Sequence, residues 1–91
     1  MSAADALALS RAMLTAARAH DWPRTEALCA ERDALLRRTR FGAADRDTLL
    51  ALATANDQLL EVVHDAQRGR ARDLRELGRG QRAREVYQAA G

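Results

Sequence analysis

Metal-binding and nucleophilic side chains are few in this chain and stand apart from one another. His20 and His64 have no second histidine or cysteine at the spacing that puts two metal ligands on one helix face, so both are expected to be surface residues. Cys29 stands among apolar residues and is expected to be a small core residue, because a reactive thiol needs exposure and a neighbouring cation. No glycine-rich phosphate loop, acid pair in a cleft pattern or nucleophile beside a base is present. The sequence therefore predicts neither an enzyme nor a metal or cofactor site.

Arginine is concentrated toward the C-terminus. Residues 66–91 hold 7 Arg and 3 acidic residues, net +4, whereas residues 1–65 hold 8 Arg and 10 acidic residues, net −2. Five arginines recur at spacings of four and three, which would align them along one side of a helix: Arg68, Arg72, Arg75, Arg79 and Arg82. Such a stripe can grip phosphates, so a nucleic-acid-binding helical protein is one alternative. Because no aromatic residue interleaves the arginines, a solvated face, or one that meets an acidic protein, is favoured over nucleic acid.

The strongest pattern is the apolar repeat over residues 45–77. At about 100° per residue its members fall on one side of a helix. They are Leu49, Leu52, Leu59, Val63, Ala66, Leu74 and Leu77. Leu60 and Val62 widen this stripe, while Asn56 and Arg70 place polar groups inside it. Polar groups on an apolar face need partners, which favours a docking surface over a sealed core.

The elements that would carry these residues are all helical. The 91 residues form one domain with a modest core, and with three valines, no isoleucine and no sustained apolar/polar alternation they do not favour strands. Helices are predicted at about 3–19, 23–39 and 45–77, with a short helical tail at 81–89. We expect a three-helix antiparallel bundle with a long third helix of about 50 Å at 1.5 Å per residue. This helix outreaches its partners, so its part beyond Ala66 is expected to protrude or to be covered by another chain.

Local signals set the expected helix ends. Ser2 is a plausible N-cap, and Pro23 suits the first turn of the second helix. Gly42 marks a turn, and Asp45 is an N-cap candidate for the third helix. The glycines at 78 and 80 are expected to interrupt that helix before the tail.

No segment has the apolar length of a membrane span, and the N-terminus lacks the features of a secretory signal peptide. Cys29 is the only cysteine, so an internal disulfide cannot form. These features predict a cytoplasmic protein.

Several segments, taken in order, resemble the FliT-type flagellar export chaperones. They are the Ser-x-x-Met-Leu stretch at 10–14, Asp21 and Trp22 at the second helix, the Asn-acid-Gln-Leu-Leu run at 56–60, and the Gly-Arg-rich stretch that ends in Tyr87. The resemblance covers nearly the whole chain. Some family members continue with a further helix that covers the binding surface, so we expect such autoinhibition to be absent or reduced here.

The resemblance implies a small cytoplasmic helical chaperone that is not an enzyme. Its client would be the C-terminal amphipathic segment of the filament-cap protein FliD, and the export ATPase complex or the flagellar master regulator would be further partners. Partner-binding residues are predicted at Leu52, Asn56, Leu59, Leu60, Val63 and Tyr87. Apolar members of this set would supply affinity, and Asn56 would fix the register.

Two questions stay open at this point. The apolar face of the third helix could be a groove for a client or simply core against the first two helices. In a further alternative, the protein is a structural dimerisation module in which the third helix pairs with its own copy.

Overall fold

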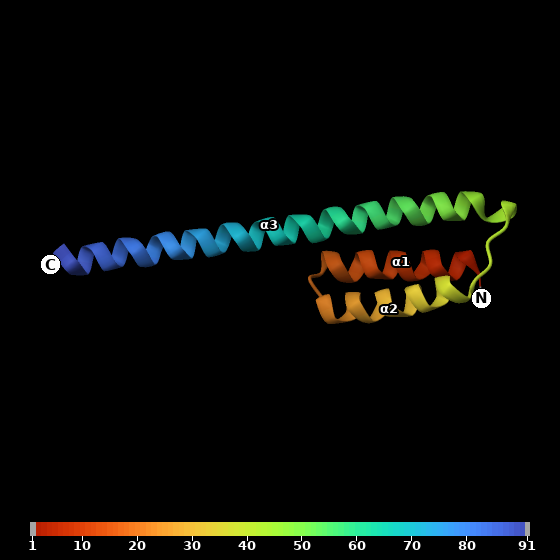
Figure 1. Cartoon of the computed structure of the whole chain (residues 1–91), viewed down its shortest axis with the longest axis horizontal. Helices are drawn as coiled ribbons and strands as arrows, with labels where there is room; N and C mark the ends of the chain where they lie inside the picture. Colours follow the sequence, from red (N-terminus) through yellow and green to blue (C-terminus); the bar gives the residue numbers. More distant parts are fainter. Residues whose placement is uncertain (1, 91) are drawn as a thin grey trace.

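The computed structural model describes residues 2–90, which form three α-helices and one turn of 3₁₀-helix. The elements are α1 (Ala3–Arg18), α2 (Trp22–Arg38), η1 (Ala43–Asp45) and α3 (Arg46–Ala90). Successive α-helices run in opposite directions (Figure 1). The prediction of an all-α fold with three main helices is confirmed, and residues 2–90 contain no strand.

The corner between α1 and α2 is specified by local chemistry. His20 takes a left-handed conformation, with φ of 58°, and Asp21 N–H then donates to Ala16 O at 2.9 Å, which satisfies a carbonyl at the end of α1. The side chain of Asp21 accepts a hydrogen bond from Arg24 N–H at 3.2 Å, and Pro23 stands in the first turn of α2. One residue therefore helps to end α1 and to begin α2.

The other two helix starts use a carboxylate that reaches back. Ser2 is the N-cap of α1, as predicted, and its N–H donates to Asp5 Oδ2 at 2.9 Å. Asp45 is not the N-cap of a third helix but the last residue of η1, and its carboxylate accepts from Gly42 N–H at 2.8 Å. Because η1 leads directly into α3, the third helix begins at Arg46 rather than at residue 45.

The predicted break at Gly78 and Gly80 is wrong, because α3 continues to Ala90 as one helix of 45 residues. Neither glycine takes a positive φ. A helical glycine costs about 1 kcal/mol relative to alanine but keeps its N–H and carbonyl in the hydrogen-bond ladder, whereas only proline removes a donor. The predicted separate tail at 81–89 is thus the last part of α3.

Helix α1 is the centre of the packing. It packs against both α2 and α3, while α2 and α3 approach each other directly at few points. Nine apolar residues are buried within residues 2–90, and six of them belong to α1. Four of those six are alanine, whose small side chain lets neighbouring helices come close. The nine are Ala3, Ala6, Met13, Leu14, Ala16, Ala17, Leu35, Ala55 and Leu59.

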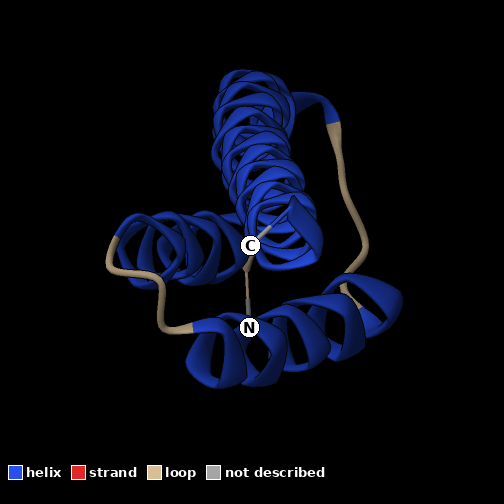
Figure 2. Cartoon of the chain, turned by 90° about the vertical axis from the view of Figure 1, so that its left-hand side faces the viewer, coloured by secondary structure: helices blue, strands red, loops and turns tan. Residues whose placement is uncertain are grey.

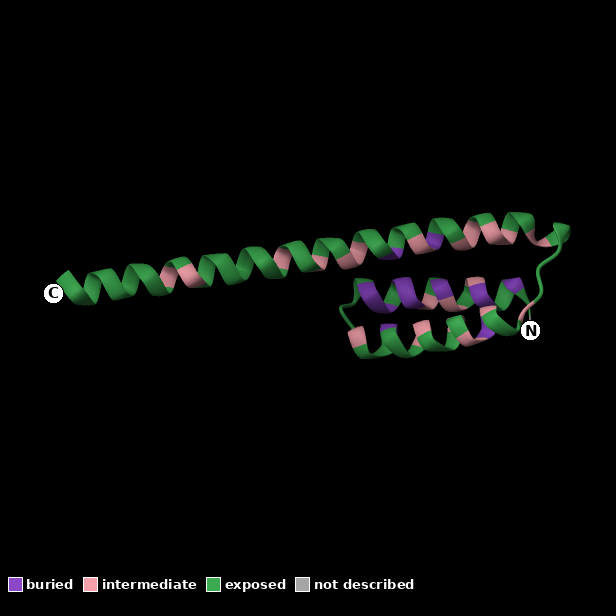
Figure 3. Cartoon of the chain, viewed as in Figure 1, coloured by how far each residue is buried: buried purple, intermediate pink, exposed green. Residues whose placement is uncertain are grey.

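The molecule is extended, with principal dimensions of 72 × 20 × 19 Å. The helical content of the predicted bundle is confirmed, but only the first half of α3 packs beside α1 and α2, and the rest projects beyond them (Figures 1 and 3). We call residues 71–90 of α3 the arm. Its apolar side chains are exposed within this chain, with Leu74 64%, Leu77 56% and Val86 70% exposed, so the third helix does extend past α1 and α2 as expected.

Candidate partner-binding groove

An open groove runs between α2 and α3. Because each of these helices packs on α1 and hardly on the other, their facing sides are left apart. Viewed along α3, α1 lies to one side of α2 and α3, and the loop between α2 and α3 crosses at the far end (Figure 2). The groove consists of two hollows, each with a wall from α2 and a wall from α3.

The first, which we call the Trp22 hollow, has a volume of about 460 Å³. Met13 of α1 lies at its base. Its α2 wall is formed by Trp22, Thr25, Glu26 and Cys29, and its α3 wall by Leu59, Val63, Ala66, Gln67 and Arg70. The residues are mainly apolar, and Trp22, Cys29 and Val63 also pack against the buried cluster formed by Met13, Leu14, Ala17 and Leu59.

The second, which we call the Leu36 hollow, has a volume of about 360 Å³. Its walls are Arg32 and Leu36 of α2 and Leu49, Leu52, Ala53 and Asn56 of α3. From Trp22 to Leu36 the α2 wall extends about 21 Å, which is 14 residues at 1.5 Å each. The two hollows together are therefore long enough for about four turns of a bound helix.

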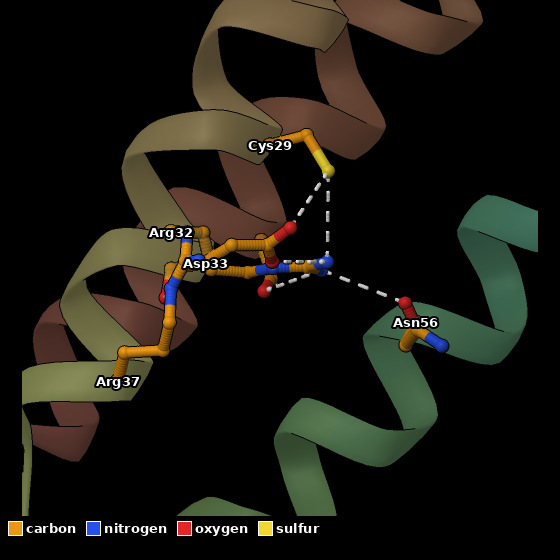
Figure 4. Close-up of polar contacts among 6 residues, drawn as sticks. Cys29, Arg32, Asp33, Arg37 and Asn56 are labelled. Atoms are coloured by element: carbon orange, nitrogen blue, oxygen red, sulfur yellow. Dashed lines mark hydrogen bonds and ion pairs between the residues drawn. The ribbon is translucent and has the colours of Figure 1, made fainter.

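Arg32 and Asn56 join the two walls near the middle of the groove. The Nη1 of Arg32 donates to Asn56 Oδ1 at 3.5 Å and to Ser10 Oγ of α1 at 3.5 Å. Figure 4 shows the guanidinium group reaching from α2 toward Asn56 on α3. Both contacts are longer than the usual 2.9–3.0 Å, so this bridge is weak. The bridge lies between the two hollows and separates them.

The structure separates the predicted partner-binding residues into three groups. Leu59 is 8% exposed and belongs to the core, and Val63 is half-buried against the same cluster. Both residues line the α3 wall of the Trp22 hollow where it meets the core. Leu52 and Asn56 are half-buried and line the Leu36 hollow.

Leu60 and Tyr87 lie elsewhere. Leu60 is 46% exposed and lines neither hollow. Tyr87 is 83% exposed and lies on the arm, 17 residues and about 25 Å along α3 from Arg70 at the end of the Trp22 hollow. The structure thus brings four of the six residues together along one wall.

The sequence pattern of the third helix did not reveal the opposite wall. Thr25, Cys29, Arg32 and Leu36 follow one another at spacings of four, three and four, which places them on one face of α2. That spacing is the signal for this wall. It is easily overlooked because only Leu36 is a large apolar residue.

The other residues considered for chemistry have ordinary surroundings. His20 stacks on Trp22 with ring centroids 5.8 Å apart. Cys29 is half-buried against the core cluster, and its sulfur accepts a long contact of 3.9 Å from Nη2 of Arg32. Within residues 2–90, no group of three or more His, Cys, Asp or Glu residues is arranged to hold a metal ion. No helix in this range has both the length and the apolar character needed to cross a membrane.

Because α3 is continuous, the arginine stripe at 68, 72, 75, 79 and 82 does lie on one helix, and all five residues are exposed. Arg68 pairs with Asp65, a contact between two highly exposed side chains that contributes little to stability. The stripe carries positive charge along the outer half of α3, and none of its five residues lines either hollow.

The fold and the groove define a small all-helical binding protein. The family model described as flagellar protein FliT matches residues 2–89, nearly the whole chain. The chain therefore belongs to the FliT family, as its resemblance indicated, and membership implies a flagellar export chaperone from a family that is not one of enzymes. No significant match was found among curated proteins or among solved structures.

Proposed function

We propose that this chain is a cytoplasmic export chaperone whose groove between α2 and α3 binds the C-terminal amphipathic segment of the filament-cap protein FliD before export. The observation that carries this proposal is the pair of mainly apolar hollows on a member of the FliT family. An amphipathic helix laid into such a groove would place its apolar side chains in the hollows.

The physical need for this binding is plain. A cap subunit that has not assembled exposes the apolar face of a helix, and an exposed apolar patch favours aggregation. Covering that face in the α2–α3 groove would keep the subunit soluble until it is exported. This function requires only binding and release of the client, and no covalent bond is made or broken.

The arm is available for a further partner. Its exposed Leu74 and Leu77 and its arginine stripe support a second contact, either with the export ATPase complex or the flagellar master regulator, or with a second copy of this chain. Each of these is compatible with a client in the groove, because the arm lies beyond both hollows.

The test is light scattering behind a sizing column, with this chain alone and after mixing with the C-terminal segment of the cap protein. A one-to-one complex is expected. The alanine at 53 is exposed and lines the Leu36 hollow, so Ala53→Arg should block the groove without removing a packed side chain. We expect binding at least tenfold weaker, about 1.4 kcal/mol.

Ala30→Arg is the matched control, since Ala30 is exposed on α2 and lines neither hollow. It adds the same charge and should leave binding unchanged. Failure to form any complex, with a homodimer that persists unchanged, would favour the dimerisation module instead. Equal weakening by both variants would show that the client binds through charge rather than in the groove.

A further inference from the structure

Arg32 is a charged residue in an otherwise mainly apolar groove. Its side chain is only 13% exposed. Among residues 2–90 its one ion-pair partner is Asp33, whose Oδ1 accepts from Nε at 3.4 Å and from Nη2 at 3.3 Å. The carboxylate of Asp33 is 49% exposed and therefore well hydrated. The other groups that accept from Arg32 are neutral: Ser10, Asn56 and the Cys29 sulfur.

These contacts are long for a guanidinium group. A charge-assisted bond from arginine to a carboxylate is usually 2.7–2.9 Å, and the pair is strongest when two such bonds run in parallel. The hydrogen bonds of Arg32 to oxygen span 3.3 to 3.5 Å. A largely desolvated guanidinium held by long contacts can gain much from a closer carboxylate, because its hydration has already been lost.

The position of Arg32 along α2 decides where that carboxylate would be. Cys29, three residues earlier, lines the Trp22 hollow, and Leu36, four residues later, lines the Leu36 hollow. Arg32 thus lies at the junction of the two hollows, and Figure 4 shows its guanidinium group on the side that faces α3. A helix in the groove that filled both hollows would have to pass this group.

We infer that Arg32 is the specificity-determining residue of the groove. It selects a partner helix that has an aspartate or glutamate at its centre and large apolar residues three or four positions away on both sides. This spacing follows because residues three and four apart share one helix face, so the apolar residues enter the two hollows when the carboxylate meets Arg32. The role deepens the proposed function and rests on it.

Charge complementarity also excludes other helices. A partner with an apolar residue at the centre would leave the guanidinium group with only its long contacts inside the protein. A partner with a lysine or arginine there would place like charges together. The groove should therefore discriminate among amphipathic helices of equal hydrophobicity.

The experiment is a double-mutant cycle with the C-terminal segment of the cap protein. Each aspartate and glutamate of the peptide is changed in turn to asparagine or glutamine, and binding is measured to the wild-type protein, to Arg32→Gln and to Arg32→Lys. We expect one peptide substitution to weaken binding to the wild type at least tenfold and to have less than a twofold effect on Arg32→Gln. Arg32→Lys should keep part of the preference, since it keeps the charge but loses the planar fork.

Arg38→Gln is the control, because Arg38 is an exposed arginine of the same helix that lines neither hollow. The scan on the wild-type protein alone remains a test should Arg32→Gln fail to fold. Binding in which every carboxylate substitution changes affinity less than twofold would overturn the role of Arg32 and leave the proposed function standing. No binding of the unmodified peptide to the wild type would instead overturn the proposed function.

Discussion

Two neighbouring leucines of α3 should differ sharply in their contribution to stability. Leu59 is 8% exposed and packs in the cluster with Met13, Leu14 and Ala17, whereas Leu60 is 46% exposed and lines neither hollow. Truncating a buried leucine to alanine costs about 2–5 kcal/mol, so Leu59→Ala should lower the free energy of unfolding by about 3 kcal/mol. Leu60→Ala should change it by no more than about 0.5 kcal/mol, because a surface substitution has little effect.

Urea unfolding followed by tryptophan fluorescence measures this difference. Trp22 is the only tryptophan and packs against the cluster that contains Leu59, so its emission reports the core rather than the arm. For a small domain with a total stability of about 5–15 kcal/mol, a loss of 3 kcal/mol is a large shift of the midpoint. Equal losses for the two variants, or a larger loss for Leu60→Ala, would refute the assignment of Leu59 to the core.

Three further predictions concern the helix ends and the arm. Asp21→Ala should lower the free energy of urea unfolding by about 1 kcal/mol, since it removes the side chain that accepts from Arg24 N–H. Asp21→Asn should lower it by only a few tenths of a kcal/mol, and equal losses for the two variants would mean that the cap does not stabilise α2. Gly78→Ala with Gly80→Ala should slow amide hydrogen exchange across the arm. It should leave unchanged the urea midpoint of unfolding that Trp22 fluorescence reports. A methyl group at Gly80 meets nothing within 4 Å, one at Gly78 meets only the end of Arg82, and alanine favours a helix by about 1 kcal/mol per residue; faster exchange would contradict this. Leu74→Asp with Leu77→Asp should change the free energy of unfolding by no more than about 0.5 kcal/mol, because both side chains are more than half exposed. A larger drop would show that the arm packs on the core.

The starts of α1 and α2 were the most predictable part of this fold. The signals at Ser2 and Pro23 are local, since each acts through its own backbone or through groups within a few residues. The continuation of α3 through Gly78 and Gly80 was not predicted. Glycine lowers helix stability by an amount that the flanking helix can absorb, and its presence alone does not decide whether a helix ends.

Only the α3 wall of the groove could be predicted from the sequence. The repeat in the third helix identifies an apolar face with Leu52, Asn56, Leu59 and Val63, but periodicity does not say which edge of that face meets α1. Which edge of the face meets α1 depends on how α2 and α3 pack against α1. The α2 wall depends on the same geometry, because Thr25 and Arg32 become groove residues only when α2 and α3 pack on α1 and stay apart.

The position of Trp22 allows a direct measurement of whether the groove is the client site. Trp22 lines the Trp22 hollow and is the only tryptophan of the chain, so a helix bound there would change its emission. The measurement is a fluorescence titration with a tryptophan-free C-terminal segment of the cap protein. We predict a saturable blue shift with one-to-one stoichiometry. Ala53→Arg should need at least tenfold more peptide to reach the same shift, and Ala30→Arg should titrate like the wild type. A complex that forms by light scattering with no change in Trp22 emission would show that the client binds elsewhere and would contradict the assignment of the groove.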